Sequence, residues 1–332
     1  MQGITALRAH PEARVLVEDV GDGRSRVSVE AEPGVFVSRA QCVSGYPLDL
    51  IERILEVKGP SYLCDEIARE EDPRYIALFL RYGLLGFLPE SEFAGARMLD
   101  FGSGSGASTV IMARMFPDAE IVGVELEPDF ADIARRRASH YGLSNFEFLL
   151  SPDPEHLPDG IGKFRHINLG AVYEHLLPDE RRSLLPQLWS VLEPGGVLFM
   201  SQLPYRYYPV DQHTTGLPMI NYLPRALAHR YAVKRSGRID PEATWPELLR
   251  AGIRGGSERE ILRDIKRGGG VAESLVPSQL GLRSHADLWY GYSNEVGPHP
   301  AKRAMRLAFR AIHAGTRTNF LPSLSLAFRK IA

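Results

Sequence analysis

A run of glycines preceded by an aspartate is the part of this 332-residue sequence best suited to chemistry. Asp100 is followed by Gly102, Gly104 and Gly106, between a short apolar stretch and a helical pattern. Glycines at such a place let the backbone turn sharply and let a ligand approach the N–H groups of a helix start. A dinucleotide-binding loop has the spacing Gly-x-Gly-x-x-Gly, and here the third glycine comes one residue early. Because the carboxylate would repel a pyrophosphate, the pattern favours a ligand that carries an amino group.

A second candidate binding residue is Glu125, which ends the next predicted strand. It follows the loop by about 20 residues, where a carboxylate can accept both hydroxyls of a ribose. Strand-end acids are often only solvated, but the position after this loop favours a binding role. The loop and Glu125 therefore indicate one site built from two strand ends.

Alternating strands and helices surround these residues and must position them. Strands are predicted at 97–101, 120–126, 146–150, 164–170 and 197–202, and helices at 107–116, 128–141 and 179–192. This order with short connections predicts an α/β fold, a Rossmann-like doubly wound and mostly parallel sheet with helices on both faces. Ligands of such sheets bind beyond the carboxyl ends of the strands.

The spacing of apolar residues in the rest of the chain differs from that in this core. Short apolar runs at 15–17, 27–29 and 35–37, separated by Gly-Asp-Gly and Pro-Gly turns, predict an antiparallel β-meander. Helical spacing follows and indicates a packing layer or a lid. We expect a meander at 1–45, a helical cap at 46–92, the binding core at 93–235 and a helical C-terminal extension with a basic tail at 236–332.

At these residues the sequence resembles the class I S-adenosylmethionine-dependent methyltransferases. The resemblance covers roughly residues 97–205 and rests on ordered motifs, which are the loop at 100–106, Glu125, the segment 168–176 and the Leu-Glu-Pro-Gly-Gly turn at 192–196. It implies an enzyme with S-adenosylmethionine as its cofactor and S-adenosylhomocysteine as a product.

The resemblance also implies roles for individual positions. The glycine loop would pass close to the methionine part of the cofactor, Asp100 would lie near its amino group and Glu125 would hold its ribose. The residues after the following strands would contact the adenine and border the sulfonium. The implied cofactor-binding residues are Asp100, Gly102, Ser103, Gly104, Gly106, Glu125, Leu126, Ser151, Asp153, Asn168, Leu169 and Gly170.

Two histidines after predicted strands are candidates for a catalytic base, since a hydroxyl acceptor must lose its proton. His175 lies in Tyr-Glu-His, which also serves as a helix start and packing element, and His213 lies in a loop with Asp211. Asp211 and His213 suit an orienting acid and a base, or two ligands of an oxygen-preferring metal. We predict His213, His175 and Asp211 as catalytic residues and expect no resident metal.

The acceptor is indicated partly by what the sequence lacks. Methyltransferases that act on nucleobase or amide nitrogens typically carry Asn/Asp-Pro-Pro-Tyr/Phe where this chain has Asn-Leu-Gly-Ala at 168–171. A hydroxyl of a sugar or another small polyhydroxylated metabolite is therefore the predicted acceptor. An amino sugar or natural-product amine is the alternative, and a non-catalytic methyltransferase-like binding module is a second one.

A tyrosine-rich stretch resembles bacterial methyltransferases associated with saccharide assembly. Its tyrosines offer flat faces and hydroxyls to a sugar ring, and its arginine suits an anionic group, although a packed aromatic cluster fits equally well. The residues predicted to bind the acceptor are Glu174, Tyr205, Arg206 and Tyr208.

The composition of the chain excludes several classes of protein. With 2 cysteines, a net charge of −2 and no stretch of about 18 apolar residues, we expect a cytoplasmic protein rather than a secreted, membrane-spanning or nucleic-acid-binding one. After Glu295 the chain has seven basic and no acidic residues, so the preceding residues carry −9. Met305 and Phe309, and likewise Leu324 and Phe328, recur at helical spacing, which predicts a basic amphipathic tail. It would pack on the acidic body or a second subunit of a homodimer, or contact an anionic membrane surface.

Overall fold

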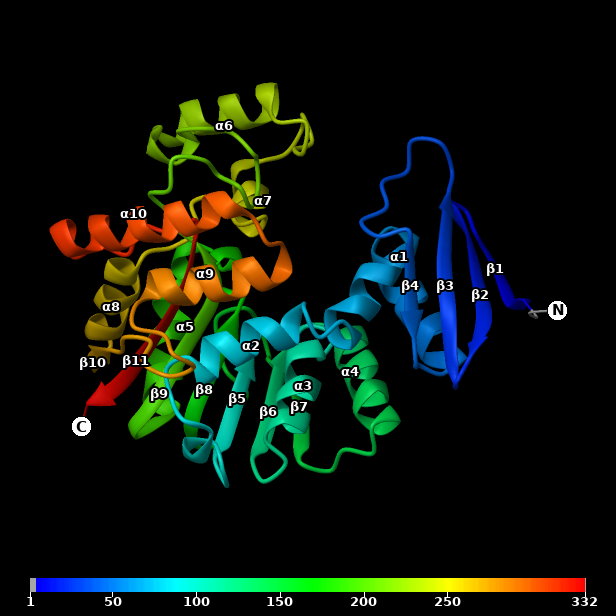
Figure 1. The fold of residues 1–332 in the computed structure, drawn as a ribbon, viewed down its shortest axis with the longest axis horizontal. Coiled ribbons are helices and arrows are strands. Elements are labelled where there is room, and N and C mark those ends of the chain that lie inside the picture. Colours follow the sequence, from blue (N-terminus) through cyan, green and yellow to red (C-terminus); the bar gives the residue numbers. More distant parts are fainter. Residues whose placement is uncertain (1–3, 332) are drawn as a thin grey trace.

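The computed structural model describes residues 4–331, with side chains from residue 10 onward. A seven-stranded sheet forms its centre, in the order β10-β11-β9-β8-β5-β6-β7 (Figure 1). The parallel strands are β5 (Arg97–Phe101), β6 (Glu120–Glu125), β7 (Phe146–Leu150), β8 (Phe164–Gly170) and β9 (Leu192–Pro204). Two antiparallel strands extend the sheet beyond β9, β11 (Ser323–Ile331) and β10 (Val271–Ser274). The predicted doubly wound, mostly parallel sheet is confirmed.

The chain reverses its direction of travel across the sheet between β5 and β8. From β5 it proceeds to β6 and β7 on one side, and then returns to β8 on the other side of β5. Connections on the two sides therefore diverge above the carboxyl ends of β5 and β8 and leave a crevice there. The glycine loop follows β5 directly, which places it at this crevice.

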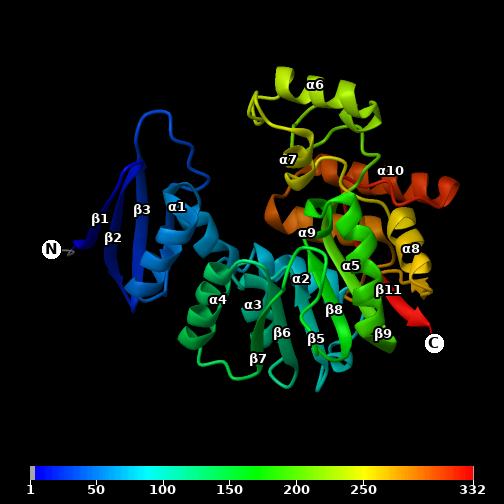
Figure 2. The ribbon, with the colours of Figure 1, turned by 180° about the vertical axis from the view of Figure 1, so that it is seen from behind.

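Helices cover both faces of the sheet (Figures 1 and 2). On one face lie α2 (Ile76–Leu85), α3 (Ala107–Met115), α4 (Pro128–His140) and α9 (His285–Val296), with α10 (Pro300–Thr316) outside α9. On the other face α5 (Pro178–Val191) packs with α8 (Glu258–Arg267). The core between these layers is apolar, and residues such as Phe164, Phe199 and Leu198 are completely buried.

A separate antiparallel sheet stands at one side of this body (Figure 1). It consists of β1 (Ile4–His10), β2 (Ala13–Gly21), β3 (Arg24–Ala31) and β4 (Gln41–Ser44). Helix α1 (Leu48–Glu71) packs against it and against α4. The helix is interrupted at Gly59, whose φ of 69° is left-handed, immediately before Pro60. The two halves of α1 thus connect the small sheet with the main body.

An excursion between β9 and α8 forms a third unit with its own small core, which includes Ile220, Leu248 and Ile253. It contains η3 (Ile220–Tyr222), α6 (Arg225–Arg235) and α7 (Trp245–Arg250). Helix α7 packs against η2 (Tyr173–His175), the short turn that follows β8. The excursion therefore covers part of the crevice. A further turn, η1 (Glu90–Glu92), precedes β5.

Two expectations for local structure are wrong. Residues 35–37 form no strand; β3 pairs instead with β4, and the Val29 N–H donates to the carbonyl of Ala40 at 2.8 Å. Residues 323–331 form β11 rather than an amphipathic helix, and Leu324 and Phe328 are buried in the sheet. Their spacing of four residues puts two side chains on one face in a strand as well as in a helix, so it did not distinguish the two.

Helix α10 does form over the predicted helical spacing of Met305 and Phe309. None of the helices among residues 4–331 is long and apolar enough to cross a lipid bilayer.

Candidate functional site

The three glycines of the loop after β5 are required for different reasons. All three have left-handed φ angles, 71° at Gly102, 55° at Gly104 and 83° at Gly106. A Cβ on Gly106 would lie 2.4 Å from the Cβ of Ala134, and one on Gly102 would lie 2.8 Å from Val172. A Cβ on Gly104 would meet no protein atom within 4 Å. The outer glycines therefore permit close packing, whereas the middle one faces open space.

Asp100 lies beneath the loop rather than in it. Its buried carboxylate accepts hydrogen bonds from the hydroxyls of Ser108 at 2.6 Å and Thr109 at 2.7 Å, and from the Asn168 amide at 2.8 Å. Burial raises the pKa of Asp100. The carboxylate joins β5, α3 and β8, and it does not line a cavity. Its predicted place beside an amino group stays a prediction.

The first cavity, which we call the loop cavity, has a volume of about 430 Å³. It is lined by the glycine loop, by α1 and by the ends of β8 and β9, including Gly102, Ser103, Gly104, Asn168, Gly170, Ser201, Gln202, Lys58, Glu66 and Arg69. The α1 residues were missed in the sequence because nothing local connects a helix near residue 60 with a loop at 100–106. Two cations, Lys58 and Arg69, therefore accompany the loop.

A buried ion pair fixes the floor of the loop cavity. The fully buried guanidinium of Arg137 donates to the Glu66 carboxylate at 3.0 Å and to the carbonyl of Ser105 at 2.9 Å. The Ser105 hydroxyl also donates to Glu66. Burial alone would raise the pKa of Glu66, but Arg137 and Lys58 lower it to about 2. Lys58 itself lies 3.8 Å from Glu66, and burial lowers its pKa.

The second cavity, which we call the acid cavity, has a volume of about 370 Å³. Five predicted cofactor residues line it, and they are Gly102, Glu125, Leu126, Ser151 and Asp153. Glu125 accepts the Gly104 N–H at 2.7 Å and the Leu126 N–H at 2.8 Å. The exposed Asp153 carboxylate accepts the Glu155 N–H at 2.7 Å. The carboxylate of Glu125 is thus held against the loop while facing the cavity.

The loop cavity and the acid cavity are continuous. Gly102, Phe130, Ala171 and His175 line both. Ala171, just after β8, has a left-handed φ of 54°, and Gln202, near the end of β9, has one of 60°. Non-glycine residues adopt this conformation rarely and often at functional sites. Of the other predicted residues, Leu169 is buried in the core and Gly106 packs on α4; neither lines a cavity.

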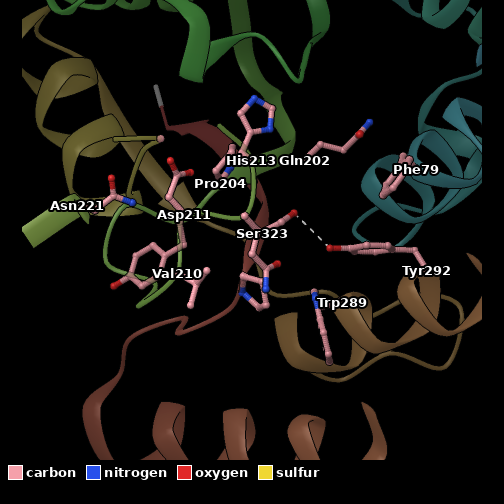
Figure 3. Close-up of a pocket in the computed structure, with 14 residues that line it drawn as sticks. Phe79, Gln202, Pro204, Val210, Asp211, His213, Asn221, Trp289, Tyr292 and Ser323 are labelled. Carbon is pink, nitrogen blue, oxygen red and sulfur yellow. Dashed lines mark hydrogen bonds between the residues drawn. The ribbon is translucent and has the colours of Figure 1, made fainter. Parts of the chain in front are cut away.

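The third cavity, which we call the aromatic cavity, has a volume of about 330 Å³ and adjoins the loop cavity at Gln202 (Figure 3). It is lined mainly by aromatic and neutral polar side chains, including Tyr205, Asn221, Trp289, Tyr292 and Ser323. The Tyr292 hydroxyl lies 3.2 Å from that of Ser323 (Figure 3).

Of the three residues in the tyrosine-rich stretch that were predicted to bind the acceptor, Tyr205 alone lines the aromatic cavity. Arg206 instead forms an ion pair with Glu260 at 3.3 Å, and Tyr208 packs on Phe320. Phe79, Trp289 and Tyr292 come from α2 and α9, outside the predicted core, so the sequence pattern could not find them.

The two predicted histidines lie side by side between these cavities. The ring centroids of His175 and His213 are 5.3 Å apart. His175 lines the loop and acid cavities, and His213 lines the aromatic cavity. The Nδ1 of His175 lies 2.6 Å from the carbonyl of Arg250. Since a carbonyl only accepts, that nitrogen carries the proton and the Nε2 lone pair is free. Burial lowers the pKa of both histidines, which keeps them neutral at pH 7.

Asp211 does not orient His213. Its buried carboxylate accepts hydrogen bonds from the N–H groups of Thr214 and Thr215 at 3.2 and 3.0 Å, and from the Thr215 hydroxyl at 2.8 Å. Among the described residues no hydrogen bond joins it to His213. The turn directs backbone donors at the carboxylate first, so the catalytic role of Asp211 stays a prediction.

Glu174, predicted to contact the acceptor, lies beside the histidines. Its side chain is buried, and its carboxylate is 3.9 Å from the Nε2 of His175. Among the described residues neither carboxylate oxygen has a hydrogen-bond partner. Burial raises the pKa of Glu174 to about 7.

Comparisons with known proteins concern mainly the central part of the chain. A protein-family profile described as "Methyltransferase domain" matches residues 98–196. A carboxy-S-adenosyl-L-methionine synthase from Chromohalobacter salexigens is 34% identical over 132 residues, which cover 36% of this chain and 45% of that protein. A trans-aconitate 2-methyltransferase from Methylobacterium radiotolerans is 38% identical over 155 residues, 46% of this chain and 55% of that protein. The chain thus spans about half the length of these relatives.

Solved structures align over more of the chain but at low identity. An O-methyltransferase family protein from Burkholderia thailandensis aligns with a TM-score of 0.47 and 12% identity, over 84% of this chain and 62% of that one. An arsenic(III) S-adenosylmethionine methyltransferase from Chlamydomonas reinhardtii aligns with a TM-score of 0.40 and 19% identity, over 74% of this chain and 66% of that one.

The family profile begins in β5 and ends in the turn that precedes the buried part of β9. It therefore includes the glycine loop, Glu125 and the ends of β6, β7 and β8 that line the loop and acid cavities, but not the end of β9. Residues 98–196 thus match a methyltransferase domain, and the doubly wound sheet around them agrees with the resemblance to the class I S-adenosylmethionine-dependent methyltransferases.

Proposed function

We propose that this protein transfers a methyl group from S-adenosylmethionine to a hydroxyl of a sugar or another small polyhydroxylated metabolite. The observation that carries the proposal is that Gln202 lines both the loop cavity and the aromatic cavity, while the neighbouring His175 and His213 line one cavity each. A methyl donor held in the first cavity would face an acceptor held in the second. Transfer needs the two reacting atoms about 3 Å apart with water excluded.

The residues around the loop and acid cavities suit S-adenosylmethionine. Gly104 faces open space, so a ligand can lie directly on the loop backbone. Glu125 faces the acid cavity and can accept the ribose hydroxyls, while Lys58 and Arg69 offer positive charge to a carboxylate in the loop cavity. Bound S-adenosylmethionine supplies a methyl group on a positively charged sulfur. The chain's own contribution is to hold that group in one orientation.

The aromatic cavity supports a neutral, hydroxyl-rich acceptor. Tyr205 and Trp289 offer flat faces, and Gln202 and Asn221 offer amide donors and acceptors. Asp211 also lines the cavity, but its carboxylate is occupied by the turn at 214–215. Sugar rings bind typically between an aromatic face and side chains of this kind.

The histidines provide the means to remove the hydroxyl proton. A neutral imidazole with a free lone pair accepts a proton near pH 7, and a positioned base of this kind contributes about 10²–10⁴ in rate. We assign this role to His213 because it lines the aromatic cavity, with His175 next to it. Replacing His213 by Ala should lower kcat on the true acceptor and leave the affinity for S-adenosylhomocysteine unchanged.

Calorimetric titration with S-adenosylhomocysteine tests the cofactor assignment. We expect binding by the wild type and a loss of about 10-fold or more in Glu125→Gln, because hydrogen bonds to a charged group are worth about 1.5–3 kcal/mol. Glu147→Gln is the matched control, since Glu147 is an exposed glutamate on the neighbouring strand β7. No heat of binding by the wild type would overturn the proposal.

A panel of polyols, sugars and amines then tests the acceptor. Methylation of an amine that survives replacement of both histidines would favour the N-methyltransferase alternative, because a neutral amine needs no base. Binding of the cofactor without transfer to any member of either class would favour the non-catalytic module.

A further inference from the structure

We infer that Glu174, His175 and His213 bind one divalent metal ion of the zinc class at the boundary between the loop cavity and the aromatic cavity. Ligand atoms from the three side chains lie within 4.8 Å of one another. The residues come from the turn after β8 and from the loop after β9, so the fold alone brings them together. The inference departs from the expectation of no resident metal.

The buried carboxylate of Glu174 is the strongest argument for a cation. Only 1% of the residue's surface is exposed, and neither carboxylate oxygen has a hydrogen-bond partner among the described residues. Desolvating an unpaired carboxylate costs several kcal/mol, so buried carboxylates are paired, protonated or bound to a metal. Among these residues the Nε2 of His175 lies 3.9 Å from the carboxylate, and because that ring is neutral at pH 7 it supplies no charge.

Among the described residues no arginine forms an ion pair with Glu174, because other groups occupy the N–H groups of Arg181 and Arg250. Arg181 donates to three backbone carbonyls, those of Leu176 at 2.9 Å, Gly255 at 2.9 Å and Glu174 at 3.0 Å. Arg250 forms a two-pronged ion pair with Glu180. The Glu174 side chain is thus buried without a hydrogen-bonded cation among the described residues.

The histidines present suitable donors. His175 is held through Nδ1 by the Arg250 carbonyl, so its Nε2 lone pair is directed to the Glu174 side. A histidine whose second nitrogen donates to a carbonyl in this way is the usual form of a metal ligand. The ring of His213 packs against Gly252, where a Cβ would come within 2.6 Å of the imidazole. The missing side chain at 252 therefore leaves room for this ring beside Glu174.

The donor set selects the class of ion. Two imidazole nitrogens and one carboxylate oxygen suit Zn²⁺ and similar transition metals better than Mg²⁺ or Ca²⁺, which prefer oxygen. Ligand atoms around Zn²⁺ lie roughly 3.3 Å apart, so the side chains would have to approach by up to about 1.5 Å. His213 is exposed, so its ring has more room to turn than that of His175, which is half-buried and held by the Arg250 carbonyl.

Three protein ligands leave a position open for another oxygen. His175 borders the loop cavity and His213 the aromatic cavity, so that position would face the acceptor. An ion there would hold the acceptor hydroxyl and lower its pKa. The metal would then promote loss of the hydroxyl proton, which is the role proposed above for the histidines. This catalytic role rests on the proposed function, whereas the binding of the ion does not.

Titration with Co²⁺ tests the site directly, because Co²⁺ replaces Zn²⁺ and absorbs visible light when bound by nitrogen and oxygen. The full chain, freed of metal with a chelator, should bind one equivalent with visible bands that added Zn²⁺ abolishes. His213→Gln and Glu174→Gln should each weaken binding at least 10-fold, because each removes one of three ligands. His140→Gln, which alters an exposed histidine packed on Tyr46, should bind as the wild type does.

The inference is overturned if the wild type shows no stoichiometric Co²⁺ bands, or if the ligand variants bind as tightly as His140→Gln. Since His213 is exposed, its variant should keep its fold even if Glu174→Gln does not, and circular dichroism checks both. Titration of the same samples with S-adenosylhomocysteine separates the two proposals. Cofactor binding without Co²⁺ binding refutes the metal alone, and Co²⁺ binding without cofactor binding refutes the proposed function alone.

Discussion

Separate replacement of Gly104 and Gly106 by Ala should affect different properties of the protein. Gly106→Ala should mainly lower the free energy of unfolding, and Gly104→Ala should mainly lower the affinity for the ligand. Both glycines have left-handed φ angles, 55° and 83°, so a Cβ costs about 1 kcal/mol at either position. Only at Gly106 does the new methyl collide with the protein, 2.4 Å from the Cβ and 2.9 Å from the Cα of Ala134. Gly106→Ala should therefore cost a further 1–3 kcal/mol or so of unfolding free energy, the range for overpacking in a rigid place.

Gly104→Ala should have the opposite profile. Its methyl would meet no protein atom within 4 Å and would project into the space that we assign to the cofactor. The protein should lose only the backbone cost of about 1 kcal/mol, while the affinity for S-adenosylhomocysteine falls at least 10-fold.

Urea unfolding followed by tryptophan fluorescence, together with calorimetric titration, measures both quantities. Equal destabilisation by the two substitutions would refute the packing argument for Gly106. Unchanged affinity of Gly104→Ala for S-adenosylhomocysteine would show that no ligand lies on this part of the loop.

Two further predictions concern buried charge. Burial lowers the pKa of His166 to about 4. As the pH is lowered from the ordinary pKa of a histidine to pH 4, the unfolded state binds more protons than the folded state. The free energy of unfolding should therefore decrease over this range by about 3 kcal/mol. Urea midpoints of His166→Gln should lack this part of the decline below pH 6.5, and parallel pH profiles of the two proteins would refute it. Arg137→Met leaves Glu66 buried without its partner and should cost about 3–5 kcal/mol in urea unfolding, whereas the neighbouring and more exposed Arg136→Met should cost less than about 1 kcal/mol. Equal losses from the two arginine substitutions would contradict this account.

The central strands could be predicted closely because each is a short apolar run bounded by turn residues. The expected strands at 97–101, 146–150 and 164–170 coincide with β5, β7 and β8. In β5 and β8 such runs report burial on both faces of a parallel sheet, whereas β7 is an edge strand in which Phe148 is the one buried residue. The glycine loop could also be predicted from the sequence, because its positive φ angles and close packing require glycine.

The parts that were not predicted depend on contacts between distant segments. Lys58 and Arg69 reach the loop cavity from α1, and Trp289 and Tyr292 reach the aromatic cavity from α9. Their spacing is that of ordinary helix faces and carries no sign of a cavity. In the same way, the orientation of His213 depends on the absence of a side chain at Gly252.

Because β11 lies inside the sheet, between β10 and β9, the cavities of the proposed site should form at different stages of folding. The glycine loop, Glu125 and the end of β8 lie within residues 97–170, so these walls of the loop and acid cavities need only pairings within that stretch. The aromatic cavity includes Ser323, which comes into place only when β11 pairs with β9 and Ser323 meets Pro204. Such distant pairings close late, because the entropy of a long loop must be lost first. A partly folded molecule would thus be able to hold the donor before any acceptor, and donor binding would stabilise that intermediate.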